Sequence, residues 1–189
     1  MTAEDVIRVL ELQPHPVEGG FFRETYRCEL QLPVSVLQAA CGFADDNLAM
    51  NAKPQAAIHY HGTSRALSTA IYYLLKPGTL SEMHRLPGDE VFHFYLGDPV
   101  VQLQLFPDGS SQELTLGTDL LNGHIPQFVV PAGVWQGAVK LHGPHGFALL
   151  GATMAPGFDY SDYVTGLRTE LTARWPAAAE RIADLTPRG

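Results

Sequence analysis

Short runs of alternating apolar and polar residues, separated by turns rich in Gly and Pro, fill most of the chain from residue 18 to residue 158. Such runs predict β-strands, because successive side chains of a strand point to opposite faces of its sheet. The expected strands are residues 18–27, 68–75, 80–86, 90–96, 99–106, 111–116, 127–130, 137–141 and 147–154. Evenly spaced strands with turn signals between them indicate an antiparallel sandwich or a closed barrel.

Helices are expected only near the two ends of the chain. Residues 2–12 predict a short helix, with a capping box formed by Thr2 and Asp5 at its start. The C-terminal segment 160–189 is also expected to be helical. Its first helix is predicted over 162–173, where two leucines lie one turn apart, and a second helix should follow the next proline.

The size of the chain suits a single domain. With 189 residues, of which 46% are hydrophobic, residues 1–189 form one predicted domain with a barrel core at about 18–158. The irregular segment 31–65 is expected to be a long connection with at most short strands, and its role is open. We expect no signal peptide and no membrane helix, which would need roughly 20 apolar residues. Cys28 and Cys41 form no CxxC pair, so we expect free thiols and a cytoplasmic protein.

The charge of the chain bears on its partners. The formal net charge is -8, from 12 basic and 20 acidic residues, and Lys and Arg form no cluster. This argues against nucleic acid, since neutralisation of phosphates dominates such binding, and against anionic membrane surfaces. A small molecule or another protein is the expected partner.

One stretch has a specific spacing of chemically active residues. Gly78 is followed after five residues by His84, then by Leu86 after one, by Glu90 after three and by Gly97 after six. This spacing resembles the first cupin motif, G-x5-H-x-H-x3/4-E-x6-G, with leucine in place of its second histidine. Cupins are double-sheet jelly rolls.

A later stretch resembles the second cupin motif, P-x-G-x2-H. In the segment PAGVWQ, at 131–136, Gln136 stands in place of the histidine. Together with HPVEGGFFRETYR, SEMHRLPGDEVFHFYLGD and APGFDYSDY, this segment is similar to the cupin-5 family, and the resemblance extends over 15–163. It implies an all-β fold, a double-stranded β-helix or jelly-roll barrel with short N-terminal and C-terminal helices, and a tendency to form homodimers. The resemblance implies no particular activity.

The substitutions in the two motifs bear on metal binding. Most cupins hold a divalent metal with three histidines and a glutamate, and the matching positions here are His84, Leu86, Glu90 and Gln136. One ligand is therefore lost, and another becomes an amide, which is a poorer ligand for a transition metal. We expect no cofactor. A divalent-metal enzyme that uses His84, Glu90 and Gln136 as ligands stays open as an alternative.

The residues that remain suggest catalysis without a metal. His84 and Glu90 are the predicted catalytic pair, because a carboxylate beside an enclosed histidine orients it and makes it more basic. Such a base can remove a proton next to a carbonyl group. Phe92 is expected to form an apolar wall, Trp135 a stacking face, and Gln136 an amide that orients the ligand. The competing interpretation is that His84 and Glu90 form a buried pair with a structural role only.

The strand EGGFFRETYR adds a hypothesis about the ligand. It is similar to the N-terminal strand of the nucleotide-sugar 3,5-epimerases, metal-free cupins in which an arginine and a glutamate hold the substrate. The matching residues are Arg23 and Glu24, and Tyr26 shares a face with Glu24. The negative net charge fits a smaller or uncharged carbohydrate-like ligand better than a nucleotide diphosphate. The resulting hypotheses are a metal-independent isomerase or epimerase, a non-catalytic ligand-binding cupin, and the divalent-metal cupin described above.

Overall fold

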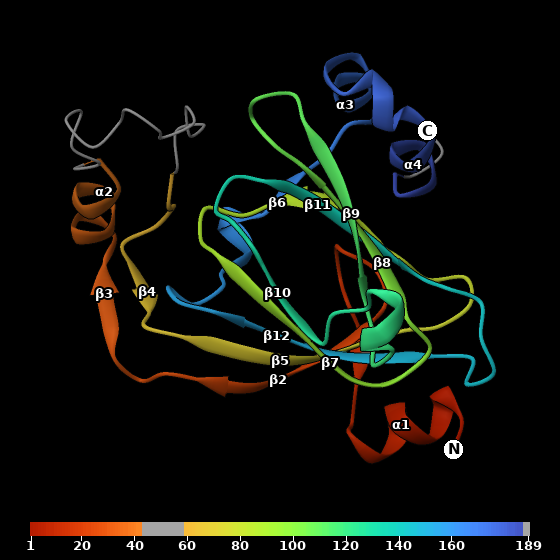
Figure 1. Ribbon diagram of the computed structural model, residues 1–189. Coiled ribbons are helices and arrows are strands. Elements are labelled where there is room, and N and C mark those ends of the chain that lie inside the picture. Colours follow the sequence, from red (N-terminus) through yellow and green to blue (C-terminus); the bar gives the residue numbers. More distant parts are fainter. Residues whose placement is uncertain (43–58, 187–189) are drawn as a thin grey trace.

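Two antiparallel β-sheets face each other and form the body of the molecule (Figure 1). The computed structural model of the protein describes residues 1–42 and 59–186. The larger sheet has six strands in the order β1 (Gln13–Pro14), β2 (Phe21–Arg27), β5 (Thr69–Leu75), β12 (Ala148–Met154), β7 (Glu90–Gly97) and β10 (Gln127–Val130). The smaller has five, in the order β13 (Val164–Thr165), β6 (Ser81–Arg85), β11 (Trp135–Lys140), β8 (Val100–Leu105) and β9 (Ser111–Leu116).

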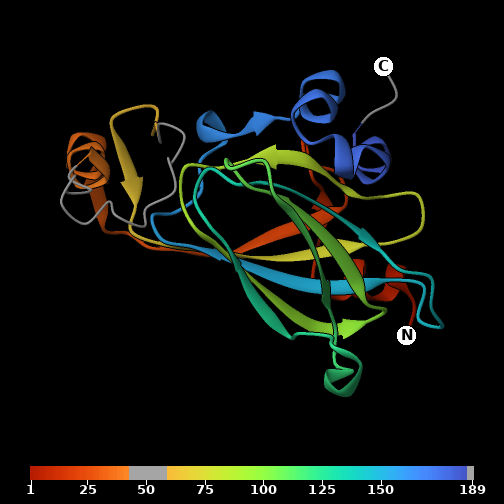
Figure 2. The ribbon, with the colours of Figure 1, turned by 45° about the horizontal axis from the view of Figure 1, so that its top comes forward.

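The chain passes repeatedly from one sheet to the other. Strands β6, β8, β9 and β11 belong to the smaller sheet, whereas β7, β10 and β12, which alternate with them in the sequence, belong to the larger. Figure 2 shows the two sheets enclosing a common interior. This is the jelly-roll arrangement, a barrel made of two sheets. It confirms the predicted fold class, and the predicted strands between residues 68 and 154 are all present.

The N-terminal helix covers the outer face of the larger sheet. Helix α1 (Ala3–Val9) begins with a capping box, because Thr2 Oγ1 accepts from the backbone N–H of Asp5 while the Asp5 carboxylate accepts from the backbone N–H of Thr2. Its apolar side packs on Leu74 and Leu149 of the sheet. The helix predicted for this end of the chain is confirmed.

The C-terminal helices cover the outer face of the smaller sheet (Figures 1 and 2). They are α3 (Arg168–Arg174), a 3-10 turn (Pro176–Ala178) and α4 (Ala179–Asp184). The prediction of a helix already from residue 162 was wrong. Residues Val164 and Thr165 instead form β13, which extends the sheet by pairing with β6. Among the described residues, no helix is long and apolar enough to cross a membrane.

The irregular segment after β2 holds a helix that the sequence did not predict. It contains β3 (Gln31–Pro33), α2 (Val34–Gly42) and β4 (Ser64–Ala66), and residues 43–58 lie outside the described part. Helix α2 packs Val34 and Leu37 against Tyr60. With so few buried apolar positions its helical periodicity is weak, which is why only short strands were expected.

Strand β8 turns its polar side chains into the barrel. Leu103 and Leu105 pack outward against the C-terminal helices, in a cluster that includes Leu171. Gln102 and Gln104 point the other way and are fully buried inside. Strand alternation therefore places the apolar side of β8 under the helices and its polar side in the interior.

Most of the other buried side chains of the interior are apolar. The main cluster includes Tyr73, Leu75, Phe92, Val100, Leu116, Phe128, Val130, Leu150 and Ala152. Gly97, which ends the first motif, has φ +104°, and a Cβ there would lie 2.2 Å from the carbonyl oxygen of Phe147. Only glycine fits this close approach between β7 and the start of β12. The motif glycine at 97 is thus explained by the fold.

Candidate functional site

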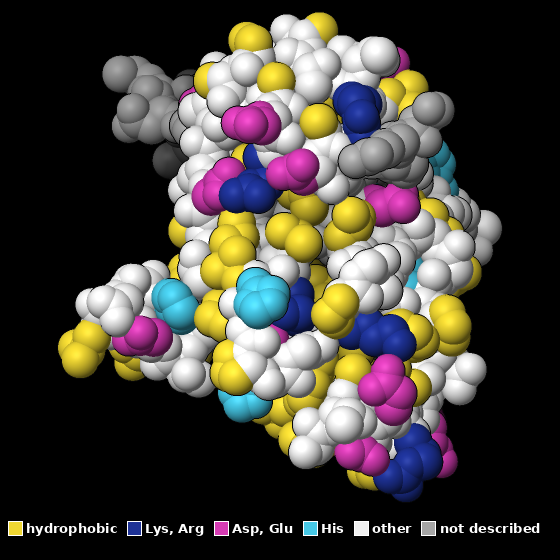
Figure 3. All heavy atoms as spheres, turned by 90° about the vertical axis from the view of Figure 1, so that its right-hand side faces the viewer, with side chains coloured by type: hydrophobic (Ala, Val, Ile, Leu, Met, Phe, Trp, Pro, Cys, Tyr) yellow, Lys and Arg dark blue, Asp and Glu magenta, His cyan; other side chains and the backbone are white. Residues whose placement is uncertain are grey.

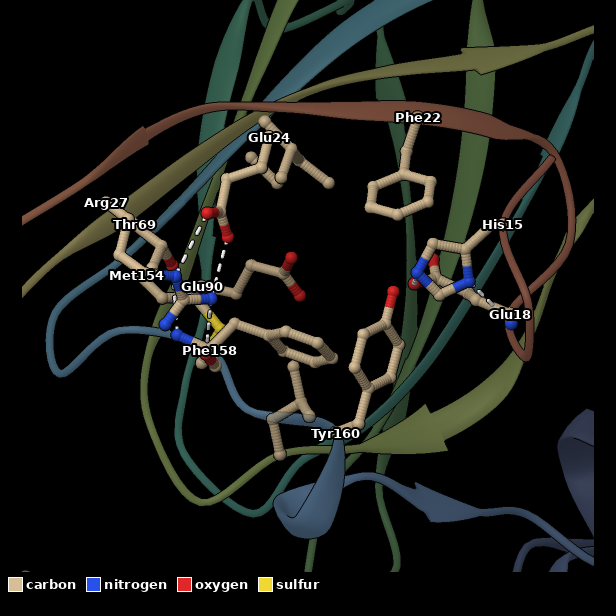
Figure 4. A pocket seen from close by; sticks show the side chains of 13 residues that line it. His15, Glu18, Phe22, Glu24, Arg27, Thr69, Glu90, Met154, Phe158 and Tyr160 are labelled. Carbon is tan, nitrogen blue, oxygen red and sulfur yellow. Dashed lines mark hydrogen bonds and ion pairs between the residues drawn. The ribbon is translucent and has the colours of Figure 1, made fainter. Parts of the chain in front are cut away.

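A cavity opens into the interior of the barrel between the N-terminal segment, β2, β5, β7, β12 and the segment after β12 (Figure 4). About 530 Å³ of space lies outside the protein atoms there, part of it open to solvent. A cavity of this size suits a small molecule.

Glu90 supplies the central charged group of the cavity. It is the first residue of β7, only 7% exposed, and its carboxyl group points into the cavity (Figure 4). The Gln136 amide nitrogen donates to Glu90 Oε2 over 2.6 Å. Burial raises the pKa of Glu90 to about 8, the negative charge of Glu18 adds to this rise, and the hydrogen bond from Gln136 opposes it. Near neutral pH this carboxyl can therefore give or take a proton.

His15 and Glu18 form a second ionisable pair, in the loop between β1 and β2. The backbone N–H of Glu18 donates to His15 Nδ1 over 2.8 Å, so the neutral imidazole carries its proton on Nε2. His15 Nε2 lies 4.0 Å from Glu18 Oε2. Burial lowers the pKa of His15, Glu18 opposes that shift, and the nearby His84 adds to it. Ser81 Oγ donates to the other oxygen of Glu18.

An ion pair stands at the other end of the cavity. Arg27 donates from Nε and Nη2 to both carboxylate oxygens of Glu24, over 2.9 and 2.7 Å, and from Nη2 to the carbonyl oxygen of Phe158 over 3.2 Å. A β-bulge between Glu24 and Tyr26 interrupts the alternation of β2. Because of this bulge Arg27, and not Tyr26, joins Glu24 in the cavity, and Tyr26 is 53% exposed.

Aromatic rings form the remaining walls. Phe22 packs edge-on to His15, with ring centroids 4.6 Å apart, and Phe158 packs edge-on to Tyr160 at 5.0 Å. In Figure 4 the Tyr160 hydroxyl points toward the side of the cavity that holds His15 and Glu18. The cavity thus combines ring faces with groups that accept and donate hydrogen bonds, as ligand sites commonly do.

A buried ion pair holds the segment that carries Tyr160. Arg65, at the middle of β4, donates from Nε and Nη2 to the two carboxylate oxygens of Asp162, over 2.7 and 2.6 Å. The backbone N–H of His61 also donates to Asp162. His61 and Arg65 therefore help to position the segment that forms one wall of the cavity.

His84 is buried in the barrel, with 1% of it exposed, but does not line this cavity. Its Nδ1 lies 2.7 Å from the carbonyl oxygen of Glu82, which can only accept, so Nδ1 carries the proton. The imidazole stacks on Tyr163 with 4.8 Å between ring centroids. His84 and Glu90 make no direct hydrogen bond. Gln136, the cross-strand neighbour of His84, is the residue that bonds to Glu90.

Tyr163 presents an unusual hydroxyl group. Among the described residues, Tyr163 Oη is buried without a hydrogen-bond partner. Burial raises its pKa, and the negative charges of Glu18, Glu82 and Glu90 raise it further. Buried hydroxyl groups normally have a hydrogen-bond partner, so Tyr163 Oη is an exception in this fold.

Three other predicted ligand-binding residues lie outside the cavity lining. Arg23 points outward and donates to the carbonyl oxygen of Leu10 and to Glu11. Trp135 is directed outward because its neighbour Gln136 is directed inward, and it packs against the C-terminal helices with the Arg85 guanidinium 4.9 Å from its ring. Phe92, fully buried, belongs to the apolar interior. Of the predicted ligand-binding residues, only Glu24 lines the cavity.

The alternative metal site does not fit the side chains. Gln136 Oε1 accepts from Gln102 Nε2 over 2.9 Å, which turns the Gln136 nitrogen, not its oxygen, toward Glu90. An amide binds a metal through its oxygen. Among the residues that the structure describes, no group of three His, Cys, Asp or Glu side chains is arranged to hold a metal ion. The arrangement of His84, Glu90 and Gln136 therefore does not fit a metal site.

Sequence reasoning missed most of the cavity. His15, Glu18, Arg27, Phe158 and Tyr160 were not predicted to bind a ligand, although all lie in segments that share the family resemblance. A histidine and a glutamate just before a Gly-Gly pair offered a signal, since two glycines permit a tight turn that can bring ionisable groups back over the start of a strand. Their proximity to Glu90 depends on strand pairing, which local patterns do not show.

Comparisons with known proteins agree with this fold. The Cupin_5 family model, described as "Cupin superfamily (DUF985)", matches residues 4–165. The uncharacterized protein YML079W of Saccharomyces cerevisiae is 29% identical over 176 residues, which cover 89% of this chain and 77% of the yeast protein. The crystal structure of protein SO0799 from Shewanella oneidensis has a TM-score of 0.76 at 31% identity, over 100% of this chain and 99% of the other. A hypothetical protein from Leishmania major has a TM-score of 0.79 at 25% identity, with 100% of both chains covered. This chain therefore belongs to the Cupin_5 family of the cupin superfamily.

Proposed function

We propose that the barrel cavity binds a small, sugar-like molecule and that the protein moves a proton on it, as a metal-independent isomerase or epimerase. The observation that carries this proposal is the buried Glu90 carboxyl, which faces the cavity with a pKa raised to about 8. A group that is poised near the working pH is suited to general acid–base catalysis.

The cavity offers the groups that such a reaction needs. Isomerisation or epimerisation beside a carbonyl group requires removal of a proton from carbon by a base and return of a proton to the neighbouring carbon or to the opposite face of the same carbon. It also requires donors that stabilise the negative charge that develops on oxygen in between. In our proposal Glu90 exchanges the proton. The Tyr160 hydroxyl and the Nε2–H of His15 donate to the ligand oxygen. Because His84 does not line the cavity, Glu90 takes the role of base that was predicted for His84.

The charges of the cavity favour a ligand with hydroxyl or amino groups. Glu18, Glu24 and Glu90 line it, and the guanidinium of Arg27, which also lines it, is already paired with Glu24. Carboxylates accept hydrogen bonds from hydroxyl and ammonium groups but repel phosphates and carboxylates. Aromatic faces suit the apolar side of a sugar ring. A neutral sugar or an amino sugar is therefore the proposed ligand class.

Two measurements test the proposal. Thermal shift with neutral sugars, amino sugars, sugar acids and sugar phosphates should identify stabilising ligands among the first two classes. Each such ligand is then incubated with the protein in D₂O, and NMR follows deuterium entering a carbon-bound position. We expect Glu90→Gln to retain the thermal shift and to slow the exchange by roughly 10²–10⁴-fold.

The exposed carboxylate Glu170 on α3 provides a matched control, since Glu170→Gln removes the same charge far from the cavity lining. It should leave the exchange rate unchanged. Equal exchange rates in Glu90→Gln and the unmodified protein would refute the proposed mechanism. Stabilisation by a ligand without any exchange assigns the cavity to binding alone, the non-catalytic alternative.

Two further proposals follow, the first from the resemblance to the cupin-5 family and the second from the cysteines. We propose that the chain forms a homodimer. We also propose that it acts in the cytoplasm, where its two cysteines would remain free thiols.

A further inference from the structure

A chain of glutamine side chains crosses the barrel interior and ends on Glu90. Gln112 Nε2 donates to Gln104 Oε1 over 3.0 Å, and Gln104 Nε2 donates to Gln102 Oε1 over 3.1 Å. Gln102 Nε2 donates to Gln136 Oε1 over 2.9 Å, and Gln136 Nε2 donates to Glu90 Oε2 over 2.6 Å. We call these four glutamines the amide chain. It leads from the exposed strand β9, across β8 and β11, to the cavity wall on β7.

All four carboxamides of the amide chain are oriented the same way. Each carboxamide has a donor end and an acceptor end, and every NH₂ group points along the chain toward Glu90. Turning Gln136 alone would place its NH₂ against the NH₂ of Gln102 and its oxygen against the carboxylate. Gln102, Gln104 and Gln136 are at most 1% exposed, so bulk water cannot repair the mismatch. The inner links therefore hold the orientation of the last one.

We propose that Gln102 and Gln104 are positioning residues, which act through Gln136 to keep its amide nitrogen directed at Glu90 Oε2. Oε2 is then held by the protein, and Oε1 is the oxygen left to exchange a proton with a ligand. The positioning of Gln136 follows from the hydrogen-bond geometry alone, whereas the catalytic role of Glu90 Oε1 rests on the proposed function. Donation from Gln136 favours the ionised carboxylate, and so it limits the effect of burial.

Other groups also set the electrostatic environment of Glu90, and the variants below leave all of them in place. They come from every segment that surrounds its carboxyl group: the His15 and Glu18 pair, the Glu24 and Arg27 pair, His84 on β6, and Tyr160 and Tyr163 after β12. A shift of the Glu90 titration in these variants therefore reports on the amide chain.

The test is a carboxyl ¹³C NMR titration of the ligand-free protein labelled at glutamate, with the Glu90 signal assigned from its loss in Glu90→Gln. Methionine is close to glutamine in length and has no donor, so Gln102→Met breaks the chain with little change in packing. We expect Gln102→Met to raise the titration midpoint of Glu90 by roughly 1 pH unit, because Gln136 is freed to turn away. Gln104→Met, one link further out, should raise it less.

The combination of variants separates positioning from a general structural effect. Gln136→Met should itself raise the midpoint, and adding Gln102→Met to it should then change nothing, because the intermediary is gone. Gln112→Met, at the exposed end of the chain, is the matched control and should leave the midpoint unchanged. Melting curves establish that each variant is folded. Where Gln102→Met does not fold, Gln104→Met provides the decisive shift.

Two results would overturn the inference. One is a Glu90 midpoint that stays unchanged in both Gln102→Met and Gln104→Met. The other is an equal effect of Gln102→Met with and without Gln136→Met, which would show that Gln102 does not act through Gln136. Since the titration uses no ligand and no turnover, its outcome is independent of whether the proposed isomerase activity is found.

Discussion

The carboxyl group of Glu90 is held where ionisation is unfavourable, and this has a consequence for stability. Its folded pKa is raised from 4.5 to about 8, so the folded protein binds this proton more tightly than the unfolded chain does. The stabilising contribution is complete below pH 4.5 and is lost as the pH rises through about 8. Above this range the buried carboxylate destabilises the fold.

Glu90→Gln should therefore stabilise the protein in a pH-dependent way. The amide is neutral at every pH, so its melting temperature should match that of the unmodified protein near pH 4.5 and exceed it increasingly toward pH 8. At neutral pH we expect a gain on the order of 3 kcal/mol, or several degrees. Thermal melts across this pH range measure it, and a difference that does not vary with pH would contradict the assigned environment.

At the same scale, motif spacing and strand parity placed some residues correctly and others not. The motif spacing assigned Glu90 and Gln136 to one site, and the two side chains are joined by a hydrogen bond. The alternation of side chains wrongly placed Tyr26 on the same face as Glu24. A bulge, which no periodic pattern reveals, shifts the later residues of β2 by one position. His15 could not be placed near Glu90 from sequence, because their proximity follows from pairing between strands far apart in the chain.

At the scale of elements, the smaller sheet depends on the C-terminal helices. Leu103 and Leu105 of β8 are covered by a cluster to which α3 contributes Leu171, itself 2% exposed. We expect Leu171→Ala to lower the free energy of unfolding by about 2–5 kcal/mol, through lost burial and the cavity left behind. Urea denaturation measures the change.

The same helix region offers the control. Leu167, at the N-cap of α3, is 55% exposed, so Leu167→Ala should change the free energy of unfolding by less than about 1 kcal/mol. Equal effects of the two substitutions would mean that the helix is not anchored through Leu171.

The strands of the barrel were predictable at this scale because each has its own alternation and turn signals. The helix α2 and the strand β13 were not. Helix α2 buries few apolar side chains, and β13 is two residues long and exists by pairing with the edge of β6. Both elements are stabilised by their neighbours and not by their own pattern.

At the scale of the whole molecule, charge is spread over the surface while acidic groups gather in the cavity. On the face shown in Figure 3, Lys and Arg side chains lie among acidic and hydrophobic ones and form no continuous basic field. The net charge of -8 adds to the negative charge of the cavity lining. Anionic ligands should therefore associate poorly, in keeping with the proposed ligand class.

The proposed homodimer is tested by light scattering on the purified chain. An apolar groove beside α1, lined by Val9, Tyr72, Tyr95 and Leu149, leaves surface on the larger sheet that a second copy can bury. We expect the mass of two chains over a wide range of protein concentration. The mass of a single chain at every concentration would contradict the proposal.

The inverted polarity of β8 also bears on how the protein is made. Its apolar side faces outward and is covered by residues 168–185, which follow every strand of the barrel in the chain. During synthesis the sheet therefore emerges from the ribosome before its cover does. Docking of the helices must complete folding, and until then the nascent protein presents an apolar sheet face on which chaperones can act.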